Sequence, residues 1–282
     1  MNIISGEKWQ DICNVSISKQ DHRMFESSKE SNLWLDIDSY DFNDYDNPSL
    51  VYANSSLLNR YKPELVKSEF IDKLKKFKNP FSLILHNSDD SFDESHKVLF
   101  DIPNIIKIYS QNVNTVHDKL IPIPIGLANS RWKWGDLQYF NSILEIDIPK
   151  TELIYFNFEL LGGARKYWRP LCYAAGVRLD LPERKRLDFK EYVKDLARHK
   201  FCLSPEGNGI DCHRMWECFY LKIVPICHRN EVTEHFAKYF PIVLVDDWNT
   251  FELSHIEGVY ESADWSNYHL LDFDEFVKEF VG

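Results

Sequence analysis

The sequence alternates short apolar runs with helix-like segments, and it does so in two successive blocks. The strand-like runs of the first block are 49–53, 81–85, 104–110 and 120–126. Those of the second block are 152–158, 200–204, 223–227 and 242–245. Strands that alternate with helices predict parallel sheets in an α/β protein. We therefore expect two Rossmann-like domains.

Segments with a helix-like spacing of apolar residues separate these runs. They are 63–77, 163–176, 188–199, 211–222 and 231–239, and a last amphipathic segment covers 270–281. Pro170 lies inside the second of them and should end or kink that helix. Pro122 and Pro124 indicate that 120–126 is an edge strand or a strand end.

The pattern changes near residues 145–151, which suggests a domain boundary. We expect Rossmann-like domains over 1–148 and 149–264, and a C-terminal helix within 265–282 that packs back toward the first domain. With 282 residues, 44% of them hydrophobic, the chain has enough apolar material for a sizeable core in each.

Charge and cysteine content limit the classes of partner. The formal net charge of -11 disfavours nucleic acid or an anionic membrane as the main partner. No apolar run approaches the roughly 20 residues of a membrane-spanning helix. The N-terminus lacks the apolar core of a signal peptide, so we expect a cytoplasmic protein. The six cysteines form no CxxC pair and are typical of reduced, mostly buried thiols.

The stretch FCLSPEGNGIDCHRMWE, residues 201–217, joins a strand end, a glycine turn and a helix start. Ligands of parallel α/β sheets bind at the carboxyl ends of strands, so this turn is expected at a ligand site. Gly207 and Gly209 permit positive φ angles and a close backbone approach. Free N–H groups at a helix start favour an anion such as a phosphate. Asp211 is a good N-cap for the helix.

One face of that helix carries three polar side chains. At ~100° per residue, His213, Arg214 and Glu217 fall within one arc, opposite an apolar arc. Arginine suits bidentate phosphate binding, and a glutamate one turn on can accept hydrogen bonds from a ribose diol. The alternative is an ordinary surface helix after a common turn. The segment lacks both the GxGxxG spacing and the Walker Lys-Ser/Thr.

Residues 201–226 resemble the signature of exostosin-like glycosyltransferases: a strand, Pro-x-Gly-x-Gly, Asp, Arg, Glu, a helix and a Val-Pro strand. PIPIGLANSRWKWGD (122–136) and LIYFNFELLGGARKYWRP (153–170) are also similar to segments of small soluble members, so the resemblance spans 80–246. Two features depart from the family. Many members are membrane-anchored in the secretory pathway, and this chain is short for their fold.

The resemblance implies a GT-B fold, in which the C-terminal half holds a nucleotide sugar and the N-terminal half holds the acceptor. On matching positions, Glu217 would bind the ribose. Arg214 would face the diphosphate, and Arg165 and Arg169 would add positive charge near the leaving group. The expected donor-binding residues are Pro205, Gly207, Asn208, Gly209, Asp211, His213, Arg214, Glu217, Arg165 and Arg169.

Inverting sugar transfer needs a base for the acceptor hydroxyl and cations for the departing diphosphate. The best candidates for the base follow a strand end in LILHNSDDSF, where we favour Asp89, with Asp90 and His86 behind it. The alternative for this cluster is a capping Asx turn. Trp132 and Trp134 can stack on an acceptor sugar, or pack in the core or between domains.

Asp36 and Asp38 form a D-x-D triplet, a pattern that binds a metal in GT-A glycosyltransferases. Such triplets arise freely in a chain with 44 acidic residues. We expect no obligatory metal or cofactor, and we keep Asp36 or Asp38 as a reserve base. Cys212, His213 and Cys218 have poor spacing for a zinc site.

The sequence therefore predicts an inverting, metal-independent glycosyltransferase that uses a nucleotide diphosphate sugar, with a UDP-sugar favoured, and a glycan acceptor. Small soluble members of the family occur in bacteria and in large algal viruses, which favours a viral enzyme that transfers xylose in the host cytoplasm. Two alternatives stay open. One is a nucleotide-sugar epimerase of similar architecture, and the other is a non-catalytic module that binds a nucleotide sugar or a glycan.

Overall fold

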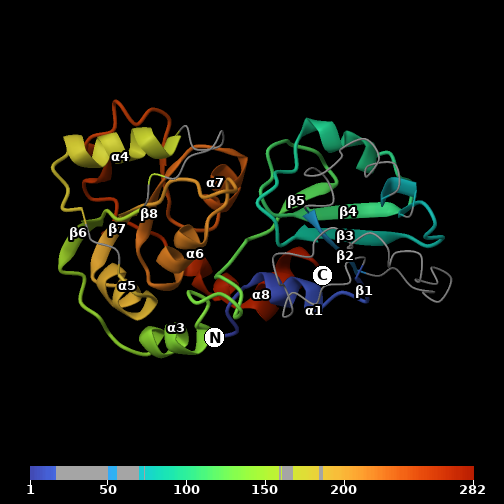
Figure 1. Ribbon diagram of the computed structural model, residues 1–282, viewed down its shortest axis with the longest axis horizontal. Coiled ribbons are helices and arrows are strands. Elements are labelled where there is room, and N and C mark those ends of the chain that lie inside the picture. Colours follow the sequence, from blue (N-terminus) through green and yellow to red (C-terminus); the bar gives the residue numbers. More distant parts are fainter. Residues whose placement is uncertain (17–49, 56–69, 73, 159, 161–167, 184–186) are drawn as a thin grey trace. The chain divides into compact units, whose positions relative to one another are not determined.

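The computed structural model describes residues 1–16, 50–55, 70–72, 74–158, 160, 168–183 and 187–282. Contacts divide the chain into an amino-terminal unit, Ser5–Ile125, and a carboxyl-terminal unit, Met1–Ile4 with Gly126–Gly282. Each unit contains one parallel sheet with helices (Figure 1). The predicted α/β class with two parallel sheets is confirmed.

The division between the units falls earlier than the change of pattern in the sequence suggests. We expected a boundary near residue 148, whereas Gly126 already belongs to the carboxyl-terminal unit. In the intervening segment, α3 (Leu137–Leu144) contacts α5 (Phe189–Leu196), and Tyr139 Oη donates a hydrogen bond to Lys190 O at 3.2 Å. The sequence shows that strand–helix alternation restarts at the next strand, but it does not show which core the preceding helix α3 packs against.

The amino-terminal unit has a five-stranded sheet whose spatial order is the sequence order. Its strands are β1 (Val15–Ser16), β2 (Leu50–Asn54), β3 (Phe81–His86), β4 (Ile105–Ser110) and β5 (Leu120–Pro122). The described unit also contains α1 (Gly6–Asp11) and a 3-10 helix, η5 (Glu94–Leu99). Most side chains of β2 and β3 are buried, as expected for parallel strands covered on both faces.

The carboxyl-terminal unit has a four-stranded parallel sheet, again in sequence order. Its strands are β6 (Glu152–Tyr155), β7 (His199–Leu203), β8 (Val224–His228) and β9 (Val243–Val245). Besides α3 and α5, its helices are α4 (Trp168–Arg178), α6 (His213–Tyr220), α7 (Glu231–Phe236), α8 (Phe273–Phe280) and the 3-10 helices η7 (Leu253–Ile256) and η8 (Ser266–Leu271).

Helices cover both faces of this second sheet. Successive side chains of a strand point to opposite faces. Phe201 and Leu203 of β7 share a buried cluster with Cys172 of α4, which places α4 on their face. Cys202, between them, lies near Cys218 of α6 and, after burial, is the next cause of the raised pKa of that thiol, which places α6 on the other face. The carboxyl end of β7 therefore leads directly into the amino end of a covering helix.

Two expectations about the ends of elements have different outcomes. Pro170 does not end its helix: it is the third residue of α4 as described, and the helix continues to Arg178. The run 120–126 contains only the short strand β5, which lies at the edge of the described sheet, as Pro122 and Pro124 indicated.

The C-terminal helix belongs to the carboxyl-terminal unit. There it contacts the first residues of the chain: Phe273 N donates to Asn2 O at 2.7 Å, and Asn2 N donates to Asp272 Oδ2 at 2.7 Å. Its expected packing toward the first domain stays a prediction. Within the described residues, no helix has both the length and the apolar composition to cross a membrane.

Candidate functional site

A cavity of about 600 Å³ lies in the carboxyl-terminal unit, at the carboxyl end of β7. Its walls come from the turn before α3, the segments around the start of α4, and the amino ends of α5 and α6. The described lining residues are Lys133, Trp134, Phe158, Arg169, Leu187, Asp188, Phe189, Tyr192, Pro205, Gly207, Cys212, His213, Arg214 and Glu217. Parallel α/β sheets bind ligands at this edge.

The helix α6 is anchored from behind by aromatic packing. Trp216 is fully buried, and its ring lies edge-on to Phe236 and Phe240, with centroid distances of 4.8 and 6.2 Å. Its indole Nε1 donates to both carboxylate oxygens of Asp211, at 2.9 and 3.1 Å. A buried indole N–H needs an acceptor, and Asp211 supplies it from a position that is 2% exposed.

The predicted N-cap role of Asp211 is therefore wrong. The N-cap of α6 is Cys212, whose side chain makes no capping hydrogen bond. Asp211 is occupied by Trp216 behind the helix and does not belong to the described lining of the cavity. The capping preference of aspartate is a local rule, and a buried partner five residues along the chain overrides it here.

The front of α6 holds Arg214 and Glu217 through a tyrosine on another helix. Tyr192 Oη, from α5, donates to Glu217 Oε2 and accepts a hydrogen bond from Arg214 Nε at 3.3 Å. Arg214 Nη1 donates to Asn157 O, at the carboxyl end of β6. The guanidinium also lies 5.5 Å from the Tyr192 ring centroid. Although Glu217 is only 6% exposed, its side chain lines the cavity.

Burial and neighbouring groups shift the pKa values of Tyr192 and Arg214. Removal from water, followed by the nearby Glu217 carboxylate, raises the pKa of Tyr192 well above its ordinary value, so its hydroxyl stays a donor. Burial opposes the charge of Arg214. Nevertheless, Tyr192, Cys202 and Glu217 raise the pKa of Arg214 well above its ordinary value. The cavity thus contains a permanent cation.

A second arginine reaches the turn after β7. Arg169 donates from Nε and Nη2 to Glu206 O, at 3.1 and 2.8 Å. The Glu206 side chain accepts a hydrogen bond from Asn230 Nδ2 at 3.0 Å. These contacts join α4, the glycine turn and the start of α7 at one edge of the sheet, and they fix the backbone that carries Gly207.

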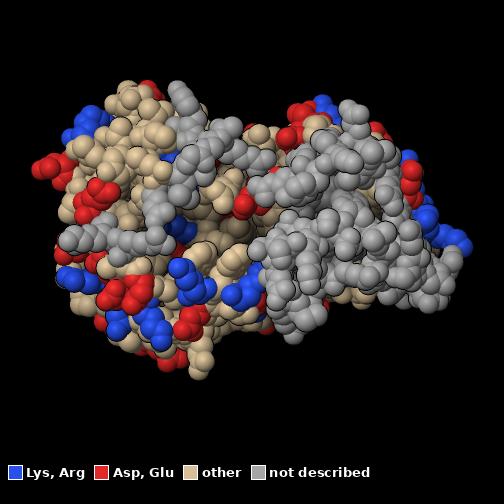
Figure 2. Space-filling model, in the orientation of Figure 1, with Lys and Arg blue, Asp and Glu red and all other residues tan. Residues whose placement is uncertain are grey.

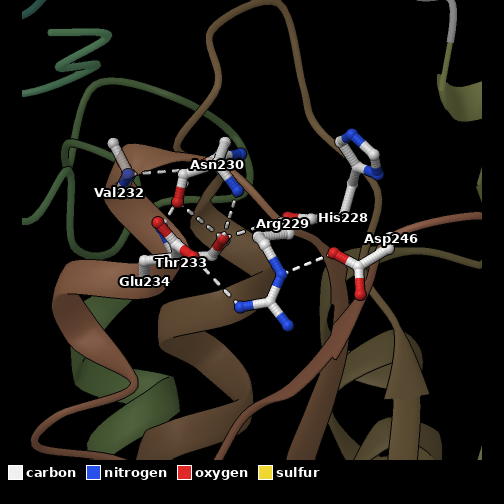
Figure 3. A network of polar contacts seen from close by, with 7 residues as sticks. All are labelled: His228, Arg229, Asn230, Val232, Thr233, Glu234 and Asp246. Carbon is white, nitrogen blue, oxygen red and sulfur yellow. Dashed lines mark hydrogen bonds and ion pairs between the residues drawn. The ribbon is translucent and has the colours of Figure 1, made fainter.

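Figure 3 shows how the loop after β8 is held. Asn230 caps α7, accepting hydrogen bonds from Val232 N and Thr233 N at 3.0 and 2.9 Å. Arg229 pairs with Asp246 at 2.5 Å and with Glu234 at 3.0 Å. The hydrogen bonds and ion pairs of this network join its own members, and Asn230 also binds Glu206, so we interpret it as support for the cavity wall and not as a binding site.

The turn does not use the positive φ angles that its two glycines permit. Neither Gly207 nor Gly209 has a positive φ. A Cβ on Gly207 would meet Cys212 Cβ at 3.5 Å and Gly209 O at 3.8 Å, which are ordinary contacts. Gly207 lines the cavity, so its missing side chain leaves space for a ligand.

A glycine with a positive φ lies elsewhere in this unit. Gly126 has φ +66°, and a Cβ there would approach Ile4 O to 2.2 Å. Its carbonyl accepts a hydrogen bond from His213 Nδ1 at 2.7 Å. His213 therefore lines the cavity and also ties α6 to the segment in which the carboxyl-terminal unit resumes.

The structure brings together most of the expected donor-binding residues. Those that line the cavity are Pro205, Gly207, His213, Arg214, Glu217 and Arg169. Asn208 is exposed and Gly209 is buried, and both lie outside the described lining. Arg165 lies outside the described residues.

Trp132 and Trp134 lie in different positions relative to the cavity. Trp134 lines the cavity, whereas Trp132 does not belong to the described lining. The two rings are nearly parallel, with centroids 5.8 Å apart, and each side chain is 45% exposed. Core packing is thus excluded for both. Trp134 lies in the same unit as Arg214, so the structure associates it with the expected donor site.

Sequence reasoning missed the wall formed by α5. Its members are Leu187, Asp188, Phe189 and Tyr192. Asp188 caps α5 by accepting a hydrogen bond from Glu191 N at 2.9 Å. A usable signal was present: in a strand–helix–strand unit, helix amino ends meet the carboxyl edge of the sheet, so the start of the predicted 188–199 helix belonged there.

The three candidates for the base differ in exposure. His86 is fully buried, and its Nε2 donates to Pro124 O at 3.0 Å. Asp90 is also buried and accepts a hydrogen bond from Ser88 Oγ at 2.9 Å. Asp89 is partly exposed, which favours it as the group that could meet a substrate. The reserve candidates Asp36 and Asp38 lie outside the described residues.

Neither a metal site nor a similar protein gives further evidence about the function of the cavity. Among the described side chains, no group of three or more His, Cys, Asp and Glu residues could hold a metal ion. The sequence matches no protein-family model and no curated protein. The function is therefore inferred from the geometry of the cavity.

Proposed function

We propose that the protein is an inverting glycosyltransferase of GT-B architecture, whose carboxyl-terminal unit binds a nucleotide diphosphate sugar in the cavity beside α6. The observation that carries this proposal is the placement of Arg214 and Glu217 on one side of the cavity, after a glycine turn at the carboxyl end of a parallel strand. A guanidinium binds a diphosphate, and a carboxylate accepts from a ribose diol.

The size and lining of the cavity support a nucleotide. Ligand pockets for such molecules measure roughly 300–1,000 Å³, and this one is about 600 Å³. Trp134, Phe158 and Phe189 provide aromatic surface on which a base can stack, at roughly 1–3 kcal/mol per base. Arg169 and Arg214 provide positive charge for phosphates.

The positive charges of Arg169 and Arg214 lie in the lining of the cavity. Arg214 makes its hydrogen bonds to a carbonyl and a hydroxyl, so its charge stays available to an anion. On the face drawn in Figure 2, Lys and Arg are interspersed with Asp and Glu over the described residues of the carboxyl-terminal unit. This distribution suits a small anionic ligand better than an extended polyanion.

In the proposed reaction, the acceptor hydroxyl oxygen attacks the anomeric carbon as the bond to the diphosphate oxygen breaks. The diphosphate leaves with the bonding electrons, and Arg214 and Arg169 stabilise its charge. Asp89 takes the hydroxyl proton as general base. A UDP-sugar donor, xylose as the transferred sugar and a glycan acceptor are the narrower parts of the proposal, which requires no metal.

The test begins with thermal shift and calorimetry against UDP, GDP and CMP, followed by their sugars. A ligand at 100 times its dissociation constant stabilises the fold by about 2.7 kcal/mol. Glu217→Ala should weaken UDP binding roughly 10- to 100-fold, because it removes a charged hydrogen bond to the ribose. Glu257→Ala, at an exposed position of the same unit, is the matched control and should bind UDP normally.

Several outcomes would contradict the proposal. If no nucleotide stabilises the protein, the donor site is wrong. Unchanged UDP affinity in Glu217→Ala would remove the ribose assignment. Incubation with the bound donor distinguishes the activities: a change in the donor sugar without acceptor would identify an epimerase, and binding without transfer or hydrolysis would identify a non-catalytic module.

A further inference from the structure

The charged groups of α6 are arranged in an unusual way. Arg214 and Glu217 are three residues apart, a spacing at which opposite charges on a helix normally meet. In the part of the chain that the structure describes, no direct ion pair joins them. Instead, each makes a hydrogen bond to the hydroxyl of Tyr192, which belongs to α5.

The chemistry of a tyrosine hydroxyl suits this intermediate position. It has one proton to donate and lone pairs that accept. Tyr192 donates its proton to Glu217 Oε2 and accepts from Arg214 Nε. Arg214 Nη2 and Glu217 Oε1 take no part in these bonds. Each charged group thus keeps one atom outside these hydrogen bonds, and both side chains line the cavity.

The position of the hydroxyl is fixed by the packing of the Tyr192 ring. The ring lies edge-on to Tyr155 of β6, at a centroid distance of 5.9 Å, and contacts Phe189 at 6.4 Å. The cap at Asp188 fixes the amino end of α5 one turn earlier. Burial keeps the hydroxyl protonated, since the pKa of Tyr192 is raised well above its ordinary value.

We infer that Tyr192 is a positioning residue, whose hydroxyl keeps Arg214 and Glu217 from pairing directly and so leaves the guanidinium for a diphosphate and the carboxylate for a ribose. This inference rests on the proposed nucleotide-binding function. Without the hydroxyl, a buried carboxylate would lose a donor and would turn to the neighbouring guanidinium, because an unsatisfied charge is costly in a poorly hydrated site. A ligand would then have to break that pair.

The experiment measures calorimetric binding of inorganic pyrophosphate and of UDP to the full chain and to two variants. Tyr192→Phe should weaken pyrophosphate binding roughly 10- to 100-fold, because the guanidinium is then engaged by Glu217. Adding Glu217→Gln to Tyr192→Phe should restore pyrophosphate affinity to within ~3-fold of the wild type, since an amide does not neutralise Arg214. UDP binding should stay weak in the double variant, which lacks the carboxylate for the ribose.

The rescue separates positioning from a purely structural role. Loss of pyrophosphate binding that Glu217→Gln does not reverse would show that the hydroxyl supports the packing of α5 on α6, and it would overturn the inference. Wild-type affinity in Tyr192→Phe would also overturn it. Tyr268→Phe is the matched control: it removes a part-buried hydroxyl of the same unit that donates to Tyr220 O at 2.7 Å, lies outside the described lining of the cavity, and should leave both affinities unchanged.

The outcomes also distinguish this inference from the proposed function. If the wild type binds neither UDP nor pyrophosphate, both the proposed function and the role of Tyr192 are contradicted. If the wild type binds both ligands and Tyr192→Phe is unchanged, only the role of Tyr192 falls. Should Tyr192→Phe not fold, Glu217→Gln alone decides the point. With Tyr192 present it should change pyrophosphate affinity less than ~3-fold, and a gain of tenfold or more would reveal direct pairing in the wild type.

Discussion

The carboxyl edges of the two parallel sheets both carry polar side chains, but these side chains have different environments. In the amino-terminal unit they form hydrogen bonds with one another or with the backbone: His86 Nε2 donates to Pro124 O, and Ser88 Oγ donates to Asp90 Oδ2. In the carboxyl-terminal unit, Arg214 and Glu217 line a cavity and are joined through the hydroxyl of Tyr192.

The backbone explains part of this difference. Asn87 and Asn112, at the ends of β3 and β4, have positive φ angles of 64° and 53°. Their side chains bind locally, Asn87 Nδ2 to Tyr52 Oη at 2.9 Å and Asn112 Nδ2 to Ser88 O at 3.0 Å. Asparagine tolerates this conformation and often closes turns with its side chain. Polar residues at a sheet edge therefore indicate a ligand site only where the loops leave space.

The substitution with the largest expected effect is Asp89→Asn, which tests whether the carboxyl edge of the amino-terminal sheet takes part in the reaction. Asp89→Asn should lower the rate of sugar transfer about 10³-fold, because a general base typically contributes 10²–10⁴. UDP affinity and melting temperature should not change. Asp101→Asn, at an exposed position of the same unit, is the control. Full transfer activity in Asp89→Asn would leave that edge without a catalytic role.

His86 separates structure from chemistry at the same edge. His86→Ala should lower the free energy of unfolding by about 2–4 kcal/mol, because it empties a buried site and removes a hydrogen bond to Pro124 O. Urea denaturation measures this, with the exposed His117→Ala as control. If sugar transfer disappears while the free energy of unfolding is unchanged, His86 acts on the substrate. The carboxyl edge of the amino-terminal sheet would then not be purely structural.

Gly207→Ala tests the cavity of the carboxyl-terminal unit by adding one methyl group to its lining. Gly207→Ala should weaken UDP binding roughly tenfold by placing a methyl group in the cavity, with little effect on stability because its contacts are ordinary. Gly258→Ala should do the opposite: Gly258 has φ +73°, so a side chain there costs about 1–2 kcal/mol without touching the cavity. Calorimetry and denaturation of both variants check this pair. Normal UDP affinity in Gly207→Ala would place the ligand elsewhere.

The last test concerns the acid sensitivity of the carboxyl-terminal unit. Burial, with a contribution from Lys238, lowers the pKa of His235 from 6.5 to about 4. The unfolded chain therefore binds this proton more tightly, and stability should fall as the pH decreases from 6.5 toward 4. His235→Gln should show a shallower loss over that range in urea titrations. Identical slopes would assign the acid sensitivity to other groups.

Local sequence patterns predicted much of the framework. The runs 81–85, 104–110 and 200–204 became β3, β4 and β7 with ends shifted by no more than one residue. Buried parallel strands are short apolar segments bounded by polar turns, which a sequence displays directly. The helices α1 and α3 were not predicted. α1 is only six residues long, and α3 lies just before residues 145–151, in what was read as the end of the first domain.

The candidate site was partly predictable for the same reason. Helical periodicity alone places Arg214 and Glu217 on one side of α6, because residues three apart always share a face. The occupation of Asp211 by Trp216 was not predictable, nor was the ordinary backbone of Gly207. Each depends on which partner the folded core offers, and a capping or turn preference does not contain that information.

The sequence by itself determined that this chain forms parallel α/β units and that a cation and a carboxylate face one edge of the second sheet. These properties follow from periodicities within single elements. Only the tertiary structure decided that Tyr192, 25 residues before Glu217, joins the two charged groups. It also decided that residues 126–148 pack with the second unit. Such contacts depend on how separate elements meet, and the energies that select them arise from burial, which no local segment specifies.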